Sequence, residues 1–405
     1  MKRGYLSEYF EGVAIKRLSA VEADETRSHQ HEYNATKAML AFMGRPAEAS
    51  RLDARFIYLN DEDDEPIVED AFLTLYDSRE NQPHRSSEYR FYFPTTQVSQ
   101  LAGENDLLLI AKRRDGGLLV IIAENGSSAA SQIEWLFGFS DDAYPKFSVR
   151  AELENEQDRI GFAATFILEN IGIVVEPRAD TYLDVMLSRF NGNFPKTADF
   201  SAFARETLDD VDPREDPDAA LIAWMEREEI LFRTLERYLI GERLSHGFSA
   251  DHVDEFVSFS LSVQNRRKSR VGLALENHME VVFNSLGIRY KRAGITENKS
   301  KPDFLLPGQQ EYHDPDFDPL RLSMLAVKST CKDRWRQVLA EANRIEEKHL
   351  LTLETAISVN QTDEMQAKRL QLVVPRGLHE TYGEAQRAWL FDVRAFTGLA
   401  SVRQG

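Results

Sequence analysis

The stretch from Lys301 to Ser329 decides the fold of the second half of this chain. It opens with KPDFLLP at 301–307 and ends with MLAVKS at 324–329. Each apolar run is long enough for one strand. A hairpin of these two strands brings Asp303, before the first strand, close to Lys328, near the end of the second. The sequence therefore predicts a carboxylate and an ammonium group side by side at one edge of a sheet.

A second carboxylate is predicted to join this pair from the element that follows. The spacing of apolar residues predicts a helix over 335–351, in which Val338 and Ile345 share a face with Glu341. Because apolar residues flank it on that face, Glu341 is expected to point toward the strand that carries Lys328.

Two carboxylates and one lysine are the groups that metal-assisted hydrolysis of a phosphodiester needs. Mg²⁺ prefers carboxylate oxygens, and a bound Mg²⁺ polarises the phosphate and lowers the pKa of a bound water. We expect Asp303 and Glu341 to hold Mg²⁺, and Lys328 to orient the attacking water or neutralise charge in the transition state. Judged by spacing alone, three ordinary solvated charges are the alternative.

A basic cluster, KDRWR, follows the predicted Lys328 strand directly. Arginine can pair bidentately with guanine, and aspartate can accept a hydrogen bond from cytosine N4. Lys332, Asp333 and Arg334 are therefore predicted to read G·C pairs in a major groove. The start of a helix with mixed surface charge is the alternative interpretation.

A second basic cluster, NRRKSR at 265–270, is predicted to form a turn before a helix. Its four cations can clamp DNA phosphates, and a solvated basic turn explains them equally well. The four candidates for phosphate contact are Arg266, Arg267, Lys268 and Arg270.

The second half of the chain is predicted to be an α/β domain, in which helices pack around a mixed sheet. Besides the helix already described, helical periodicity covers three segments: 219–239, 250–264 and 271–286. Besides the two strands already described, an apolar run at 370–375 predicts one more strand.

The first half is predicted to be an all-β barrel or sandwich. Five short runs rich in aromatic and β-branched residues begin at Ala54, Asp70, Tyr89, Asp106 and Gly117. The last two runs flank Asp-Gly-Gly at 115–117, which is a strong hairpin signal. A helix is expected over 158–175. We predict one domain over 1–200, an acidic linker over 201–218 and a second domain over 219–405.

Composition narrows the class of protein. The chain has 405 residues, of which 42% are apolar and 29% charged, as expected for two or three soluble domains. Its one cysteine, Cys331, excludes an internal disulfide and a multi-cysteine zinc site, and favours the cytoplasm. No segment of signal-peptide or membrane-spanning character is found. The net charge of −18 argues against a general nucleic-acid coat protein, but residues 261–350 are net basic, which permits one specific polyanion site.

The C-terminal part resembles the EcoRII-type restriction endonucleases, which are type IIE enzymes. The resemblance covers about 190 residues and is specific. It runs through NRRKSR at 265–270, KPDFLLP at 301–307, LAVKSTCKDRWRQ at 325–337 and RLQLVVPRGLH at 369–379. It implies the PD-(D/E)XK nuclease fold. In the family's variant motif the second acid is separated from the lysine; here likewise Ala326 stands two residues before Lys328.

The resemblance also implies roles for individual residues. Asp303, Lys328 and Glu341 match the catalytic set, and Glu276 matches an auxiliary carboxylate. Tyr312 matches a further position implicated in the family's active site. Lys332 matches both an active-site position and, with Asp333 and Arg334, the readers of the CC and GG halves of the recognition site.

The N-terminal half is similar, in patches, to the family's effector domain, a B3-like pseudobarrel that binds DNA. The matching segments are IKRLSA at 15–20, His29-Gln30 and YDSR at 76–79. The candidates for DNA contact in this half are Lys16, His29, Arg79, Arg85 and Arg90. For the aromatic strand YRFYF at 89–93, a place in the core is the favoured interpretation over base stacking.

Taken together, the sequence predicts a cytoplasmic, Mg²⁺-dependent type II restriction endonuclease that cuts double-stranded DNA at a short CC…GG-containing site. We expect a homodimer, because a symmetric site calls for two nuclease domains, and activation by a second copy of the site. The alternatives are a DNA-binding regulator without cleavage and a nuclease directed at mismatches or damage. Trp224 is expected to be a buried anchor of its helix, and a base-flipping role for Trp224 or Arg227 stays open.

Overall fold

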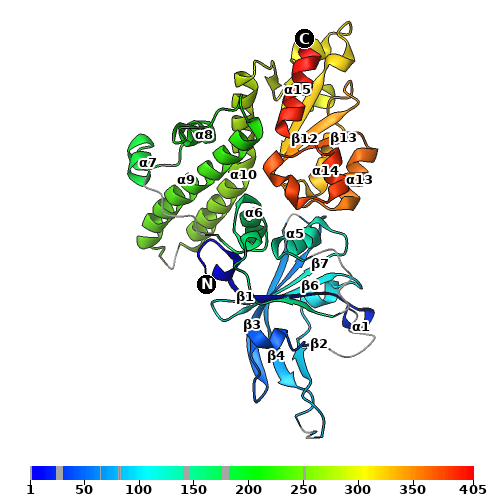
Figure 1. Cartoon of the computed structure of the whole chain (residues 1–405). Coiled ribbons are helices and arrows are strands. Elements are labelled where there is room, and N and C mark those ends of the chain that lie inside the picture. The colour runs from blue at the N-terminus through cyan, green and yellow to red at the C-terminus, as the bar shows by residue number, and fades with distance from the viewer. Residues whose placement is uncertain are drawn as a thin grey trace. The chain divides into compact units, whose positions relative to one another are not determined.

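The computed structural model divides into two compact units, each built around one sheet (Figure 1). Unit 1 comprises Met1–Val174 and Thr355–Gln361, and unit 2 comprises Val175–Glu354 and Thr362–Gly405. The structure describes residues 2–23, 31–63, 65–80, 82, 84–139, 146–175, 182–249 and 252–405, without the side chain of residue 333. The chain is thus a mixed α+β protein, as predicted.

Unit 1 contains an eight-stranded sheet with the order β2-β5-β4-β3-β7-β6-β1-β8. Neighbouring strands are antiparallel, apart from the parallel pair β3 and β7. All five strands predicted from the sequence are confirmed. The strands are β1 (Phe10–Arg17), β2 (Glu32–Asn34), β3 (Ser50–Leu59), β4 (Ile67–Asp77), β5 (Tyr89–Tyr92), β6 (Leu107–Arg113), β7 (Leu118–Ala123) and β8 (Ser148–Arg150).

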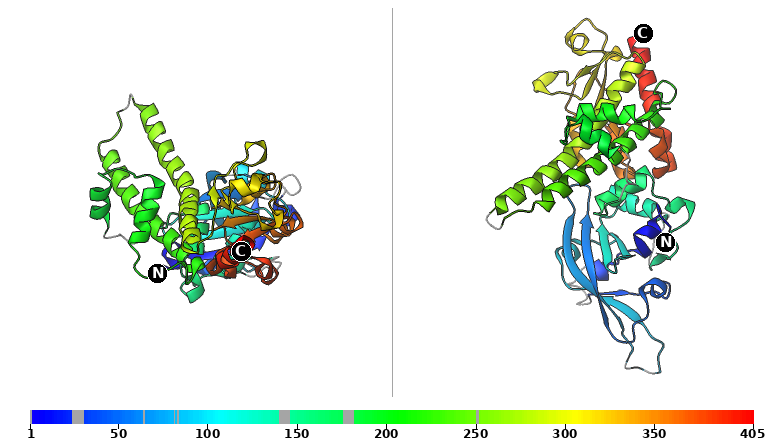
Figure 2. Two further views of the ribbon diagram at one scale, coloured as in Figure 1. Left: turned by 90° about the horizontal axis from the view of Figure 1, so that it is seen from above. Right: turned by 90° about the vertical axis from the view of Figure 1, so that its left-hand side faces the viewer.

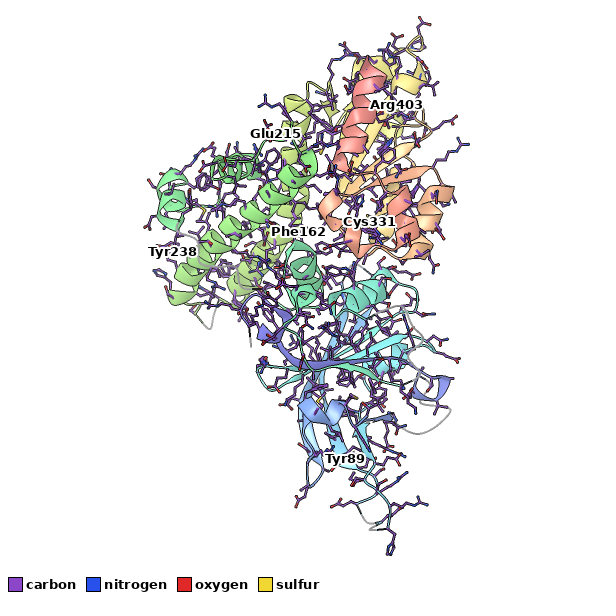
Figure 3. All side chains as sticks on the ribbon, in the orientation of Figure 1. Tyr89, Phe162, Glu215, Tyr238, Cys331 and Arg403 are labelled. Atoms are coloured by element: carbon purple, nitrogen blue, oxygen red, sulfur yellow. The ribbon has the colours of Figure 1, made fainter. Side chains whose placement is uncertain are left out.

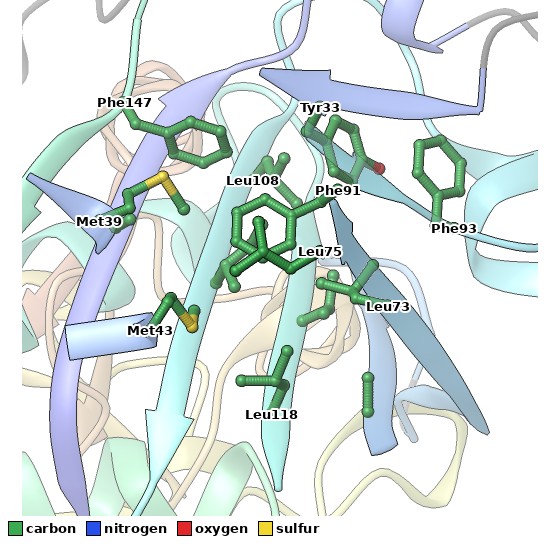
Figure 4. Close-up of a cluster of buried hydrophobic side chains, with 14 of the residues drawn as sticks. Tyr33, Met39, Met43, Leu73, Leu75, Phe91, Phe93, Leu108, Leu118 and Phe147 are labelled. Atoms are coloured by element: carbon green, nitrogen blue, oxygen red, sulfur yellow. The ribbon is translucent and has the colours of Figure 1, made fainter. Parts of the chain in front are cut away.

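The core of this sheet is formed by aromatic and aliphatic side chains from strands distant in the sequence (Figure 4). Phe91 and Phe93 are buried within it, as favoured above for this strand, whereas Tyr92 is 40% exposed and lies outside the core. The predicted hairpin is also confirmed. Gly116 adopts a φ of +93°, and Arg113 N donates to Gly117 O at 2.9 Å, which closes the turn between β6 and β7.

Short helices complete unit 1, and α6 confirms the helix expected over 158–175. The helical segments are η1 (Leu6–Glu8), α1 (Ala20–Ala23), α3 (Met39–Met43), α4 (Gln97–Leu101), α5 (Ser128–Leu136), η2 (Glu156–Asp158) and α6 (Phe162–Asn170). Hydrogen bonds explain why a segment of distant sequence belongs here. Asp61 accepts from Ser128 N at 2.9 Å and from Gln361 Nε2 at 2.8 Å, and Ser358 N donates to Ser128 Oγ at 3.0 Å.

Unit 2 begins with four helices, α7 (Leu183–Arg189), α8 (Thr197–Glu206), α9 (Pro217–Ser245) and α10 (Val253–Ser285). The two long helices α9 and α10 lie side by side (Figures 1 and 2). Asp216 caps α9 by accepting from Ala219 N at 3.2 Å, and Pro217 occupies the first turn. Apolar residues of α7 and α8 share a core with α9. The predicted linker and domain boundaries concern independent folding and stay predictions.

One expectation for these helices is wrong. Separate helices were predicted over 250–264 and 271–286, with a basic turn between them. Instead α10 is a single 33-residue helix, and the basic segment 265–270 lies inside it. Glu236 and Glu229 of α9 pair with Arg267 and Arg270 of this basic segment. These pairs offset the repulsion between neighbouring cations, so the segment remains helical.

The second sheet has five strands in the order β13-β12-β11-β10-β9. Strand β10 is antiparallel to β9 and β11, whereas β11, β12 and β13 are mutually parallel. The strands are β9 (Lys291–Arg292), β10 (Phe304–Leu306), β11 (Ser323–Lys328), β12 (Lys348–Thr352) and β13 (Leu370–Val373). The remaining helical segments are η3 (Glu297–Lys299), α11 (Gln309–His313), η4 (Pro319–Arg321), η5 (Lys332–Arg334), α12 (Trp335–Val338), α13 (Val359–Ala367), η6 (Arg376–Thr381), α14 (Glu384–Trp389) and α15 (Val393–Gln404).

The predicted helix over 335–351 is also wrong. The helix α12 stops at Val338, and the chain then turns, with Ala342 at a φ of +48°, into strand β12. All five residues of β12 are buried between β11 and β13. A strand buried on both faces has no alternation of apolar and polar residues, so its apolar run resembles that of a buried helix.

Candidate active site

The hairpin of β10 and β11 brings Asp303 and Lys328 together as predicted. Phe304 pairs with Leu325, which places Asp303 beside the end of β11. Asp303 Oδ2 accepts from Lys328 Nζ at 3.0 Å and from Val327 N at 2.7 Å. Both side chains are about one fifth exposed, at 23% for the lysine and 20% for the aspartate. The pair is therefore fixed by the sheet and still accessible to a ligand.

Glu341 lies in the turn after α12, where its backbone N donates to Val338 O at 3.1 Å. Burial raises the pKa of Glu341 to about 7; the charge of Lys328 opposes this rise and that of Asp303 reinforces it. These charge effects place the carboxylate in the electrostatic field of the hairpin pair. Its Oε2 is buried and has no hydrogen-bond partner within the described part of the chain.

Glu276 reaches the same region from α10. Burial raises the pKa of Glu276, the charge of Asp303 raises it further, and those of Arg292 and Lys328 oppose the rise. Arg292, on β9, donates to Glu276 Oε2 at 2.7 Å from Nη2 and at 3.0 Å from Nε. The same guanidinium donates to Glu280 at 2.7 Å. The sequence analysis missed Arg292, because the two-residue strand β9 that places it beside β10 has no apolar run to mark it.

The carboxylates fit a divalent cation. Among the residues that the structure describes, no group of three or more His, Cys, Asp and Glu side chains is arranged to hold a metal. Glu341 nevertheless has a buried oxygen without a hydrogen-bond partner within the described part of the chain, and the negative charge of Asp303 contributes to its raised pKa. A cation relieves both costs, and Mg²⁺ typically takes only one or two carboxylates and completes its shell with waters and substrate phosphate.

Tyr312 contacts Glu297 and the turn that follows Glu341. It is 1% exposed, and its hydroxyl donates to the Glu297 carboxylate, whose oxygens lie 2.6 and 2.7 Å away. The backbone N of Arg344 donates to the same hydroxyl at 3.3 Å. The Tyr312 hydroxyl therefore faces the turn that follows Glu341. Glu297 was missed in the sequence analysis, and no local motif marks it.

Comparison with known proteins finds a family to which part of the chain is similar. Residues 232–397, which carry the whole carboxylate and lysine set, match the family model described as EcoRII C terminal. A curated relative, the type II restriction enzyme EcoRII of Escherichia coli, is 45% identical over 189 residues, which make up 45% of this chain and 46% of that relative. The matched segment thus spans about half the length of the relative.

Solved structures give weaker likenesses. Metal-depleted Ecl18kI in complex with uncleaved DNA is 17% identical with a TM-score of 0.45, and covers 55% of this chain and 83% of that one. The complex of restriction endonuclease PspGI with substrate DNA is 16% identical with a TM-score of 0.40, and covers 58% of this chain and 94% of that one.

Within the segment that matches the family model, the predicted base-reading residues form η5, directly after the Lys328 strand. Arg334 Nη2 donates to Thr330 Oγ1 at 2.9 Å and to Thr330 O at 3.1 Å, which holds the guanidinium against its own loop. The backbone of Lys332 has a φ of +34°, and the side chain of Asp333 lies outside the described residues.

Cys331 anchors this loop from inside. Its thiol is buried among the elements of unit 2 (Figure 3), and its backbone N donates to Glu354. Burial raises the pKa of the Cys331 thiol well above its usual value, and the nearby Glu354 adds to the rise. The residue is therefore a packed anchor without nucleophilic character.

The basic cluster of α10 largely serves the domain itself. Arg267 pairs with Glu236 at 2.7 Å, and Arg270, whose side chain is 7% exposed, pairs with Glu229. Arg266 stacks over the ring of Phe194 at 3.9 Å. The side chain of Lys268 is exposed.

Trp224 and Arg227 also serve packing. Trp224 is 3% exposed, with its ring 5.6 Å from that of His278, which confirms the buried anchor. Arg227 Nε donates to Thr207 Oγ1 at 2.7 Å, which ties α9 to the end of α8.

The candidates for DNA contact in unit 1 are mostly paired with acids. Lys16 is 7% exposed and binds Glu22 at 2.6 Å. Arg90 donates to Glu32 at 2.7 Å and to Glu88 at 2.9 Å. The remaining candidates are Arg79, which also pairs with Glu88, the exposed Arg85, and His29, which lies outside the described residues.

The raised pKa of Glu341 predicts a pH-dependent stability in EDTA. Folding moves this pKa from 4.5 to about 7, so the folded state holds a proton that the unfolded chain has released. The carboxyl therefore destabilises the fold increasingly as the pH rises from 5 to 8. We expect Glu341→Gln to be more stable than the unaltered chain at pH 8, and by a smaller margin at pH 5, in urea denaturation.

The matched control is Glu346→Gln, whose side chain is 82% exposed. It should change stability little at either pH. An equal gain for Glu341→Gln at both pH values would contradict the raised pKa.

Proposed function

We propose that this chain is a cytoplasmic type II restriction endonuclease that hydrolyses phosphodiester bonds of double-stranded DNA with Mg²⁺ at a short CC…GG-containing site. The observation that carries the proposal is the 3.0 Å contact between Lys328 Nζ and Asp303 Oδ2, in a segment that matches the EcoRII C-terminal family model. The charges of both residues also act on the pKa of Glu341.

Each residue of the site has a role that follows from its position. Asp303 and Glu341 offer the oxygens that would hold Mg²⁺. Glu276 adds a further carboxylate that interacts electrostatically with Asp303 and Lys328. When bound, the metal polarises the phosphate and lowers the pKa of a water. Lys328 presents its ammonium group beside Asp303, where it orients the water and offsets charge that develops on the phosphate.

Recognition is assigned to the loop that follows β11. Lys332, Asp333 and Arg334 follow the catalytic lysine within six residues, so base reading and cleavage use one continuous segment. Arginine and lysine suit guanine, and aspartate suits the amino group of cytosine, which together fit CC and GG steps.

Cleavage should depend on both the metal and the lysine. We expect the full-length protein to produce discrete ends at one short motif in unmethylated DNA with Mg²⁺, and none with EDTA. Lys328→Ala should reduce cutting by about 10²-fold or more and leave binding of the same duplex largely intact. Sequencing of the new ends and a gel-shift assay measure the two effects.

The outcomes separate the proposal from its alternatives. Specific binding without any cutting, with activating duplexes also present, would indicate a DNA-binding regulator. Cutting confined to mismatched or damaged DNA would indicate a repair nuclease. Cleavage retained in Lys328→Ala would contradict the role of that lysine.

We propose that the active form is a homodimer formed through α10. The first half of α10 exposes an apolar stripe, in which Val253 is 63%, Phe256 48%, Val257 46% and Leu261 52% exposed. Residues at these spacings share one helical face. A symmetric DNA site needs two nuclease domains related by a two-fold axis, and a second copy of this helix is the partner that such an axis supplies.

Charge supports an antiparallel pairing of the two helices. Asp254 and Lys268 lie seven residues before and after Leu261, on the same face and with opposite charge. If the two-fold axis passes near Leu261, Asp254 of each copy meets Lys268 of the other. The pairing thus joins apolar contacts at the centre to ion pairs at both ends.

A charge at the centre of this stripe should weaken the dimer. We expect Leu261→Glu to raise the dimer dissociation constant by at least about 10-fold, because it buries an unpaired carboxylate next to its symmetry copy. Light scattering over a concentration series measures the effect. Leu320→Glu is the control, because Leu320 is 80% exposed and lies in η4. An unchanged Leu261→Glu dimer would exclude this face.

We propose that unit 1 is a B3-like effector domain that binds a second copy of the DNA site and thereby releases cleavage. Its eight-stranded, largely antiparallel sheet is compatible with an open pseudobarrel. Arg85 is the exposed candidate for DNA contact, and Arg79 and Arg90 become available if DNA displaces their acidic partners.

Removal of unit 1 tests this regulation. A truncated chain that begins at Tyr182 keeps α7 and α8, which share a core with α9. We expect it to cleave DNA carrying a single site faster than the whole chain does, and to lose the response to an added activator duplex. Circular dichroism establishes that the truncated chain is folded. Equal or lower activity from a folded truncated chain would count against inhibition by unit 1.

A further inference from the structure

Glu341 is held in a different way from the other groups of the site. Asp303 and Lys328 are fixed by the backbone ladder of β10 and β11. Glu341 instead follows a four-residue helix, in a turn where Ala342 has a φ of +48°. No β-ladder or helical repeat fixes the carboxylate, so its position depends on contacts that hold this turn.

Two successive backbone N–H groups of the turn donate to one pair of side chains, the half-buried Glu297 and the buried Tyr312. Asn343 N donates to Glu297 Oε2 at 3.2 Å, and Arg344 N donates to the Tyr312 hydroxyl at 3.3 Å. The hydroxyl in turn donates to the Glu297 carboxylate, with oxygens at 2.6 and 2.7 Å. Glu297 and Tyr312, the clamp, therefore fix the two residues that follow Ala342.

Two further cations tie the same turn to its surroundings. Arg344 donates to Asp314 O at 2.8 Å and Phe317 O at 2.9 Å, which joins the turn to the residues after α11. Lys348, 8% exposed, donates to Ile345 O at 2.9 Å. Burial lowers the pKa of Lys348, and the charges of Glu297 and then Glu341 oppose the drop, so this lysine lies within the field of both carboxylates.

The clamp is ionised at neutral pH. Burial alone would raise the pKa of Glu297, but hydrogen bonds from the Tyr312 hydroxyl and from backbone N–H groups hold it below its ordinary value. Hydrogen bonds to a charged acceptor are shorter and stronger than neutral ones. A carboxylate that accepts from both a phenol and a backbone amide is therefore a rigid support.

We propose that Glu297 and Tyr312 are positioning residues that hold Glu341 where it can bind the catalytic metal. The inference rests on the proposed function. It gives Tyr312, matched by resemblance to an active-site position, a role exerted through the turn and without contact to the phosphate. Residues that orient metal ligands typically affect metal affinity by about 10- to 100-fold.

Direct metal binding tests the clamp. Full-length Lys328→Ala protein, bound to its duplex so that it does not cut, is titrated with Mn²⁺, and free Mn²⁺ is followed by electron paramagnetic resonance. Adding Tyr312→Phe or Glu297→Gln should weaken Mn²⁺ binding about 10-fold and leave DNA affinity nearly unchanged in a protein that is still folded. The two changes together should weaken it no more than either alone, because they break one unit.

Controls make each outcome decisive. Tyr5→Phe removes a comparable tyrosine–carboxylate bond, to Glu156 at 3.3 Å in unit 1, and should leave Mn²⁺ binding unchanged. Glu341→Gln should weaken it strongly; if it does not, the assigned metal site fails together with the clamp. If Mn²⁺ binding is lost in Glu341→Gln but normal in Glu297→Gln and Tyr312→Phe, the metal site stands and the positioning role of Glu297 and Tyr312 is wrong. If Tyr312→Phe does not fold, Glu297→Gln decides.

Discussion

The hydrogen-bonded ion pair between Lys328 Nζ and Asp303 Oδ2, 3.0 Å long, is the interaction around which the candidate site is arranged. It exists because two short strands pair antiparallel, with Phe304 opposite Leu325. The same Asp303 oxygen accepts from Val327 N at 2.7 Å, so the carboxylate is tied to backbone as well as to the lysine. The geometry of acid and ammonium is thus set by a β-ladder and does not depend on a loop.

The second acid, Glu341, is not held by a β-ladder. Glu341 stands in a turn, and its pKa of about 7 reflects burial near Asp303 without a hydrogen-bond partner for one oxygen. The fold compensates with a layer of side chains behind the turn. A metal ion would supply the positive charge that the carboxylate lacks, and the site is therefore built to be completed by its ligands.

Basic residues that stand out in this sequence are often paired with acidic side chains in the structure. Arg267 and Arg270 belong to the most basic run of the chain, yet both pair with acids of α9. Lys16 and Arg90 in unit 1 are paired in the same way. A cation that is largely buried needs a partner, and a chain with a net charge of −18 supplies many.

The sequence by itself determined the local elements and the core of the site. Five of the eight strands of the first unit, the Asp-Gly-Gly hairpin and the pairing of Asp303 with Lys328 all follow from turn chemistry and short apolar runs, which act between neighbours in the chain. Only the tertiary structure decided that 348–352 is a central strand and that α10 runs unbroken. It also decided that Glu297 supports the turn of Glu341. Each of these depends on a partner far away in the sequence, whose position no local pattern encodes.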